Sequence, residues 1–229
     1  MNPFIIEFEK QKLIGDTTAA SSKCAMLCLH GGGIAGRKGL EPIRTALEQK
    51  GISTCAFDFM GQGDTGGDLK KSSLKKRTEQ ALAIIASLNL APPVSLLASS
   101  MGGYTAIKIA SMIQVDRLIL LAPAVYDVDA YDKPFGSEFS TIIRKPSSWR
   151  NSDAWELLKT FKGDLLIFEA QLDDVIPHEI IERIYNSAIQ ARSREIVTVQ
   201  NATHPLTSWL AQHSSDLEMT LNRVSQLFY

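Results

Sequence analysis

The sequence has few of the features that mark secreted, membrane or nucleic-acid-binding proteins. Its three cysteines cannot all pair within the chain, so a dense disulfide framework is excluded. No C-x-x-C pair indicates a zinc or dithiol redox site, and no apolar run reaches the roughly 18 residues of a membrane-spanning helix. Lys and Arg (24) balance Asp and Glu (25), which leaves no basic excess for nucleic acid or an anionic membrane.

The beginning of the chain lacks the features of a secretory signal. Residues 1–10 have no basic stretch and no long apolar stretch, so we expect no cleaved leader and a cytoplasmic protein. The apolar surroundings of Cys24, Cys28 and Cys55 indicate buried free thiols. With 45% hydrophobic and 21% charged residues, residues 1–229 have the composition of one large globular domain. We expect a monomer or a homodimer, without nucleic-acid partners or stable membrane insertion.

Short apolar runs alternate with helical patterns along the chain. Strands are predicted over residues 4–9, 23–29, 52–59, 94–98, 117–122, 164–169 and 194–199, and helices over about 39–50, 72–88, 101–113, 178–190 and 206–228. This alternation predicts an α/β fold, in which a mostly parallel sheet is covered by helices on both faces. Right-handed crossovers bring the carboxyl ends of the strands to one edge, where active groups gather.

The segment 123–163 interrupts the alternation, because it has no strand pattern and is rich in aromatic residues. Loops of this length are usually functional or carry small elements of their own. The candidates for lining a substrate pocket are Tyr126, Phe135, Trp149 and Leu206. Packing of the aromatic residues onto the sheet explains them equally well.

A strand-to-helix turn has the pattern of a serine nucleophile. Its sequence is Ala98-Ser99-Ser100-Met101-Gly102. A nucleophile on such a sharp turn needs small residues two positions before and two positions after it, because the backbone passes close to itself. Ser100 meets this condition, whereas Ser99 has Leu97 and a methionine at the same distances. Alanine stands where the usual pattern has its first glycine, so the pattern alone is weak.

The strand predicted at 23–29 ends in a glycine turn, His30-Gly31-Gly32-Gly33. Glycines after a strand leave backbone N–H groups accessible, and acyl transfer needs such donors to form an oxyanion hole. We expect the donors to be the N–H groups of Gly32 or Gly33 and of Met101, which starts a helix whose dipole adds to the field. The rival interpretation is a phosphate-binding loop, but neither a Gly-Lys-Ser/Thr ending nor a G-x-G-x-x-G spacing is present.

A serine hydroxyl needs a base, and His204 is the candidate among four histidines. It follows the last predicted strand, which places it at the edge where the strands end. Its imidazole needs a carboxylate that fixes the tautomer and stabilises the positive charge. Asp173 and Asp174 follow the strand at 164–169, and Asp127 follows the preceding strand, so three candidates for the acid remain.

Taken together, these motifs resemble the α/β-hydrolase superfamily. The chain order Ser100, Asp173, His204 is the order of that superfamily. Residues 170–177 resemble its acid turn, G-x-x-D-x-x-V-P, with Ala and Ile substituted, and this resemblance selects Asp173. Residues 58–65 resemble its D-x-x-G-x-G-x-S/T loop, in which the first aspartate, here Asp58, has a structural role.

The resemblance implies a serine hydrolase of one α/β domain, with residues 123–163 as a short lid. It points to small serine esterases, thioesterases and lipases, which cleave an ester or thioester through an acyl-enzyme and need no metal or organic cofactor. Serine peptidases and acyltransferases share the same triad, and a non-catalytic small-molecule-binding protein on the hydrolase fold is a further alternative. Covalent reactivity at Ser100 and a panel of esters, thioesters and peptides separate these possibilities.

One basic cluster, residues 70–77, runs from Lys70 to Arg77. We interpret it as the solvated face of the helix that starts near residue 72 rather than as a partner site. Nearby acidic residues, among them Asp68 and Glu79, dilute its field.

Overall fold

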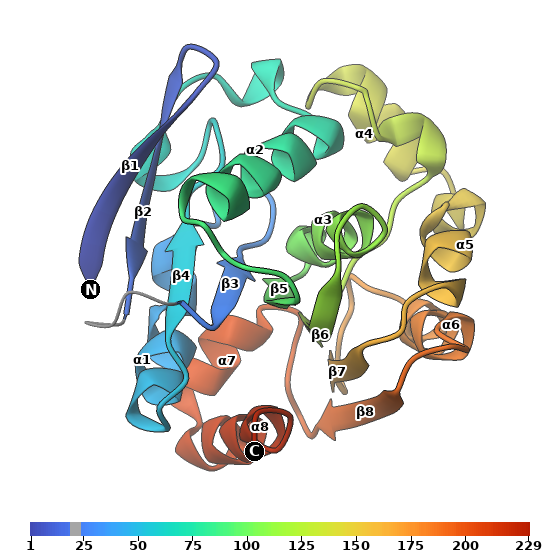
Figure 1. Cartoon of the computed structure of the whole chain (residues 1–229). Helices are drawn as coiled ribbons and strands as arrows, with labels where there is room; N and C mark the ends of the chain where they lie inside the picture. Colours follow the sequence, from blue (N-terminus) through green and yellow to red (C-terminus); the bar gives the residue numbers. More distant parts are fainter. Residues whose placement is uncertain (19–23) are drawn as a thin grey trace.

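An eight-stranded sheet forms the centre of the fold (Figure 1). The computed structural model describes residues 1–18 and 24–229, so Lys23, the first residue of the strand predicted at 23–29, lies outside the described residues. The strands are β1 Asn2–Phe8, β2 Gln11–Thr17, β3 Met26–Leu29, β4 Thr54–Phe57, β5 Val94–Ser99, β6 Val115–Leu121, β7 Asp164–Ala170 and β8 Ser193–Val199. Their order across the sheet is β1-β2-β4-β3-β5-β6-β7-β8.

Six of these strands, from β4 across to β8, run parallel to one another. The hairpin of β1 and β2 adds to one edge and is antiparallel to β4. Every residue of β3, β4 and β7 is buried, which is why these strands are mostly apolar and do not alternate between apolar and polar residues. The predicted α/β class and the mostly parallel sheet are confirmed.

Helices cover both faces of the sheet, as predicted (Figure 1). The helices are α1 Glu41–Gln49, α2 Leu74–Ser87, α3 Met101–Ala110, α4 Ser137–Ile143, α5 Ala154–Lys159, α6 His178–Ser187, α7 Leu206–Gln212 and α8 Ser214–Ser225. Apolar side chains of α2, α3, α5 and α6 form a buried cluster with one face of the sheet, and those of α1, α7 and α8 form a second cluster with the other face.

Strand β2 was not predicted, and the strand predicted at 4–9 begins earlier, at Asn2, and ends at Phe8. The two strands pair from Asn2 with Thr17 to Phe8 with Gln11, which leaves a turn of two residues. Glu9 occupies this turn with φ of +53°. The turn carries neither Asn-Gly nor Asp-Gly, the residue pairs that mark a two-residue hairpin in a sequence.

One further helix differs from prediction. The single helix predicted over 206–228 is divided into α7 and α8, because His213 between them is extended (φ −124°, ψ +90°). As expected, the segment 123–163 has no strand and carries small elements of its own, among them the short helices α4 and α5. Of these, α5 packs on α3 and α6, whereas Phe139 and Ser140 of α4 line a pocket together with Gly32 and Met101.

The three cysteines are free, with Cys28 and Cys55 buried and Cys24 half-buried. Burial raises the pKa of the Cys28 thiol to about 12, which keeps it protonated. Within residues 1–18 and 24–229, none of the helices is both long enough and apolar enough to cross a membrane.

Candidate active site

Ser100 lies at the tip of the turn between β5 and α3, with φ of +50° and ψ of −119°. A positive φ is costly for a residue with a side chain, so the surrounding backbone must hold it. The Ser100 N–H donates to the Leu121 carbonyl (3.0 Å), and the Ser100 carbonyl accepts from the N–H groups of Gly103 (2.8 Å) and Ala124 (3.0 Å). These three bonds tie the turn to α3 and to the end of β6.

The small residues around Ser100 are required by close backbone contacts. A Cβ on Gly102 would lie 2.7 Å from the carbonyl oxygen of Leu29 and 2.9 Å from that of His30. Ala98 is fully buried in β5, where it pairs with Leu29 of β3. The turn therefore sits directly against the end of β3, and this explains the spacing of small residues in the sequence.

Ser100, His204 and Asp173 form a continuous hydrogen-bonded series. The Ser100 Oγ lies 2.9 Å from His204 Nε2, and His204 Nδ1 lies 2.9 Å from Asp173 Oδ2. The other carboxylate oxygen, Asp173 Oδ1, accepts from the N–H groups of Val175 (2.9 Å) and Ile176 (2.8 Å). With Asp173 ionised, the imidazole carries its proton on Nδ1 and presents the lone pair of Nε2 to the serine hydroxyl.

The other two acid candidates lie elsewhere. Asp174 is exposed. Asp127 is buried, but its carboxylate accepts from Asn151 Nδ2 (2.8 Å) and from the Asp129 N–H (3.0 Å) within segment 123–163. Asp173 is thus the member of this set whose carboxylate reaches His204.

The glycine turn lies beside Ser100 and Met101. A Cβ on Gly31 would lie 3.4 Å from Ser100 Cβ, and a Cβ on Gly32 would lie 2.8 Å from Met101 Cε. Gly33 has φ of +63° and open space on the side where a Cβ would be. Met101 is the first residue of α3, so its N–H has no partner inside the helix. The turn and the helix start therefore bring backbone donors to the neighbourhood of the serine.

His30 has a structural environment. Its Nε2 accepts from the Phe59 N–H (3.2 Å), and its Nδ1 lies 2.8 Å from the Gly31 carbonyl, to which it donates. Burial, together with the nearby Arg77 and Arg37 charges, lowers the pKa of His30 to about 3. The ring is therefore neutral at physiological pH and serves as a fixed donor and acceptor.

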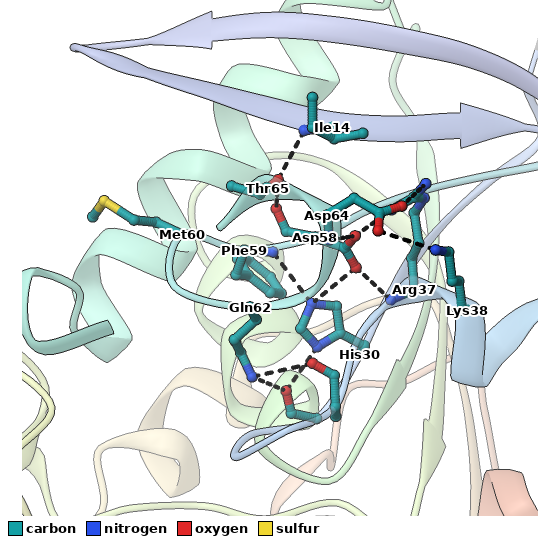
Figure 2. Close-up of polar contacts among 12 residues, drawn as sticks. Ile14, His30, Arg37, Lys38, Asp58, Phe59, Met60, Gln62, Asp64 and Thr65 are labelled. Carbon is teal, nitrogen blue, oxygen red and sulfur yellow. Dashed lines mark hydrogen bonds and ion pairs between the residues drawn. The ribbon is translucent and has the colours of Figure 1, made fainter. Parts of the chain in front are cut away.

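The loop after β4 is anchored by Asp58, as the resemblance implied (Figure 2). Its carboxylate accepts from the Arg37 N–H (2.6 Å), the Arg37 guanidinium and the Asp64 N–H (2.9 Å). Thr65 Oγ1 donates to the Asp58 carbonyl (2.7 Å) and accepts from the Ile14 N–H (2.8 Å). These bonds join the loop to the edge hairpin and to the segment that follows the glycine turn.

Two pockets meet at Gly32. One, of about 430 Å³, is mainly apolar; its lining includes Gly32, Gly33, Gln62, Leu69, Met101, Phe135 and Phe139. The other, of about 390 Å³, contains the serine and histidine; its lining includes His30, Gly31, Gly32, Ile34, Ser100, His204, Thr207 and Ser208. Ser100 and His204 thus lie in the second pocket, which shares Gly32 with the first.

Of the four predicted pocket residues, Phe135 lines the apolar pocket. Tyr126 packs edge-on against Tyr104, and Trp149 packs edge-on against Trp155. The prediction for Leu206 is wrong, because its side chain is fully buried in the cluster formed with α1 and α8. Its neighbours in sequence reach the pocket, but helical geometry at the start of α7 turns Leu206 toward the sheet.

The interpretation of 70–77 as a solvated face is wrong for Ser72, Ser73 and Leu74, which are buried, and for one of its basic residues, Arg77. Arg77 is fully buried and reaches under the glycine turn. Gln62, in the loop after β4, also contacts this turn (Figure 2). Sequence reasoning missed both residues; the signal for Arg77 was its position three residues after Leu74, which places both on one face of α2.

Within the described ranges, no cluster of three or more His, Cys, Asp or Glu side chains could hold a metal ion.

The family match and the solved structures with the same fold place the chain in the α/β-hydrolase superfamily. Residues 20–149 match the family described as serine aminopeptidase, S33, and the chain belongs to that family. No curated protein matches the chain in sequence.

Solved structures with the same fold have low sequence identity to this chain. Est1E from Butyrivibrio proteoclasticus with bound ferulic acid is 16% identical, with a TM-score of 0.71 over 97% of this chain and 99% of that one. The thioesterase domain from the curacin biosynthetic pathway is 16% identical, with a TM-score of 0.72 over 97% and 99%. Mouse α/β hydrolase domain-containing protein 10 is 15% identical, with a TM-score of 0.71 over 100% and 98%.

Proposed function

We propose that the chain is a serine hydrolase that cleaves a carboxylic ester or thioester through an acyl-enzyme on Ser100. The observation that carries the proposal is the series Ser100 Oγ, His204 and Asp173, joined by two contacts of 2.9 Å at the carboxyl edge of the sheet. A base hydrogen-bonded to the nucleophile, and itself oriented by a carboxylate, is the arrangement that serine catalysis needs.

In the first half of the reaction, Ser100 Oγ forms a bond to the carbonyl carbon as its proton passes to His204 Nε2. The carbonyl electron pair moves onto oxygen, and the N–H groups of Met101 and of Gly32 or Gly33 bind this oxyanion. When the tetrahedral intermediate collapses, the bond to the leaving group breaks. His204 then gives its proton to the departing alcohol or thiol.

In the second half, water gives a proton to His204 as its oxygen attacks the acyl carbon. Collapse of the second intermediate releases the carboxylic acid and returns the proton to Ser100 Oγ. Asp173 stabilises the imidazolium in both halves and keeps its tautomer fixed, without taking up the proton itself.

The two pockets indicate where the acyl group and the leaving group of a substrate bind. The apolar pocket of about 430 Å³, with Phe135 and Phe139 in its wall, suits a small or medium-sized acyl group. The pocket of about 390 Å³ contains Ser100, His204 and the hydroxyl residues Thr207 and Ser208, and it suits the leaving group. Residues 123–163, which contribute Phe135 and α4, then act as a short lid within a single domain.

The second candidate is a serine aminopeptidase, because the matching family carries that description. Both activities use the same nucleophile and base, so substrate preference separates them. Para-nitrophenyl esters of short, medium and long acyl chains, matching thioesters and aminoacyl para-nitroanilides form a suitable panel.

The test compares the wild type with Ser100→Ala and with the matched control Ser99→Ala. We expect Ser100→Ala to lower kcat for the best substrate by more than about a thousandfold, with the circular dichroism spectrum unchanged. Ser99→Ala keeps turnover. Full activity in a folded Ser100→Ala variant contradicts the proposal. Turnover of the aminoacyl anilides that depends on Ser100, without turnover of the thioesters or the acyl esters, replaces the esterase by the peptidase.

A further inference from the structure

Arg77 is a buried cation whose hydrogen-bond partners are neutral. It projects from α2, it is fully buried, and it makes no ion pair with a carboxylate among the described residues. Its Nη2 donates to the carbonyls of His30 (2.6 Å) and Gly31 (3.1 Å), and its Nη1 donates to Gln62 Oε1 (2.5 Å). The guanidinium also lies 3.6 Å from the centre of the Phe59 ring. Burying a charge without a counter-ion is costly, so this position needs a reason.

Donors from Arg77, His30 and Gln62 surround the Gly31 carbonyl, and Arg77 also donates to the preceding carbonyl, that of His30. The Gly31 carbonyl accepts from Arg77 Nη2 (3.1 Å) and from His30 Nδ1 (2.8 Å), and Gln62 Nε2 lies 3.5 Å away. The bond between Gly31 and Gly32 is a planar trans peptide, so the Gly32 N–H points opposite to that carbonyl. Donors that hold the carbonyl toward α2 therefore direct the Gly32 N–H away from α2, and Gly32 is the residue where both pockets meet.

Gln62 holds the later residues of the glycine turn by further hydrogen bonds. Its Nε2 donates to the carbonyls of Gly33 (2.8 Å) and Ala35 (3.3 Å). Arg77 can only donate, so its bond to Oε1 fixes the amide with its NH2 group toward the turn. Glycines supply little conformational restraint of their own, which makes an external one necessary at 31–33.

We propose that Arg77 is a positioning residue, which holds the glycine turn directly and through Gln62 so that the Gly32 N–H is directed at the oxyanion. The inference rests on the proposed function, because an oxyanion forms there only if Ser100 attacks a carbonyl. The positive charge beside the Gly31 carbonyl also polarises the peptide and strengthens the N–H as a donor. A carboxylate partner would neutralise this effect, which accounts for the neutral surroundings of the guanidinium.

The test uses Arg77→Met, which removes the charge and the donors at similar length. Its control is Arg44→Met, because Arg44 is also buried but lies away from the glycine turn. Arg44 pairs with the Asp16 carboxylate (2.6 Å) and bonds to Thr54 Oγ1 (3.1 Å) and to the Asp16 carbonyl (3.0 Å). At a temperature where both variants are folded, we expect Arg77→Met to lower kcat about 10- to 100-fold with little change in KM, since full loss of one oxyanion donor costs about 10²–10³-fold. Arg44→Met keeps the kcat of the wild type.

A second measurement does not depend on turnover. In protein labelled with ¹⁵N-glycine, we expect the amide resonances of the turn 31–33 to shift or broaden in Arg77→Met and to stay in place in Arg44→Met. If the wild type shows no turnover that depends on Ser100, the proposed function fails, and the resonances still decide whether Arg77 holds the turn.

Wild-type kcat and unmoved glycine resonances in a folded Arg77→Met variant overturn the inference, even if the variant is less stable. If Arg77→Met does not fold, Gln62→Met takes its place. This substitution removes the amide that donates to the Gly33 carbonyl and leaves the Arg77 side chain in the protein. A lowered kcat with a shifted Gly33 resonance then supports the inference, and wild-type values of both overturn it.

Discussion

Gly102 provides a sharp test of how the serine turn is built. In Gly102→Ala, the new Cβ would lie 2.7 Å from the Leu29 carbonyl oxygen and 2.9 Å from that of His30. Both atoms belong to the backbone at the end of β3, so they cannot move aside as a flexible side chain would. Either α3 or the end of β3 must shift by several tenths of an ångström.

The magnitude follows from two opposing effects. Overpacking of this kind costs about 1–3 kcal/mol, while replacing glycine by alanine gains about 0.4–1 kcal/mol by restricting the unfolded chain. The difference lies between about 0 and 2.6 kcal/mol, so we expect Gly102→Ala to lower the free energy of unfolding by roughly 1.3 kcal/mol. Gly39→Ala is the control for stability, because a Cβ there meets nothing within 4 Å, and we expect it to be neutral or slightly stabilising.

A shift of α3 or of the end of β3 also moves Ser100 away from the backbone N–H groups of the glycine turn. Misplacement by about 1 Å can cost about a hundredfold in rate, so we expect Gly102→Ala to lower kcat at least about tenfold. Urea unfolding and steady-state kinetics measure the two effects. Equal stability changes in Gly102→Ala and Gly39→Ala, or wild-type kcat in Gly102→Ala, would refute the steric explanation of the turn.

Three further predictions test the acid, the buried histidine and the acyl pocket. Asp173→Asn lowers kcat by about 10⁴-fold and Asp174→Asn leaves it near the wild-type value, because Asp173 alone of the two reaches His204; loss in the second variant alone contradicts this assignment. The pKa of His30 is lowered to about 3 in the folded chain. Between roughly pH 6.5 and 3, the unfolded chain therefore binds a proton that the folded chain does not. The free energy of unfolding then falls as the pH falls, by up to about 1.4 kcal/mol per pH unit. His30→Gln therefore flattens the pH dependence of urea unfolding in that window, and an unchanged slope argues against a buried neutral ring. Phe135→Ala lowers kcat/KM for medium-chain esters about tenfold and leaves acetyl esters unchanged; equal losses for both place Phe135 outside the acyl pocket.

The parallel part of the sheet could be predicted because strands such as β3, β4 and β7 are buried throughout and mostly apolar. Gly51, with φ of +80°, marks the end of the helix before β4. Strand β2 escaped prediction because its burial is partial and its turn, at Glu9, uses an unusual residue type. Hydrophobic patterns thus identify strands well when every residue is buried, and poorly at the edge of the sheet, where burial is partial.

The candidate site was likewise predicted only in part. Ser100 and His204 could be chosen from their positions after strands, since parallel topology fixes where strand ends meet. Position alone left Asp173, Asp174 and Asp127 open, and the family resemblance selected Asp173. Arg77 and Leu206 were misjudged because the direction of a side chain depends on the turn of its helix, which a charge run or a loop position does not reveal. Burial of a charged residue depends on partners in distant segments, and here these are backbone carbonyls.

The most direct test of the central claim is covalent labelling by a fluorophosphonate probe, followed by peptide mass spectrometry, on the wild type, Ser99→Ala and Ser100→Ala. The proposed series Ser100, His204 and Asp173 predicts one modified residue, Ser100, in the first two proteins and no modification in the third. Absence of labelling in the folded wild type, or labelling that persists in Ser100→Ala, would contradict the claim that Ser100 is an activated nucleophile.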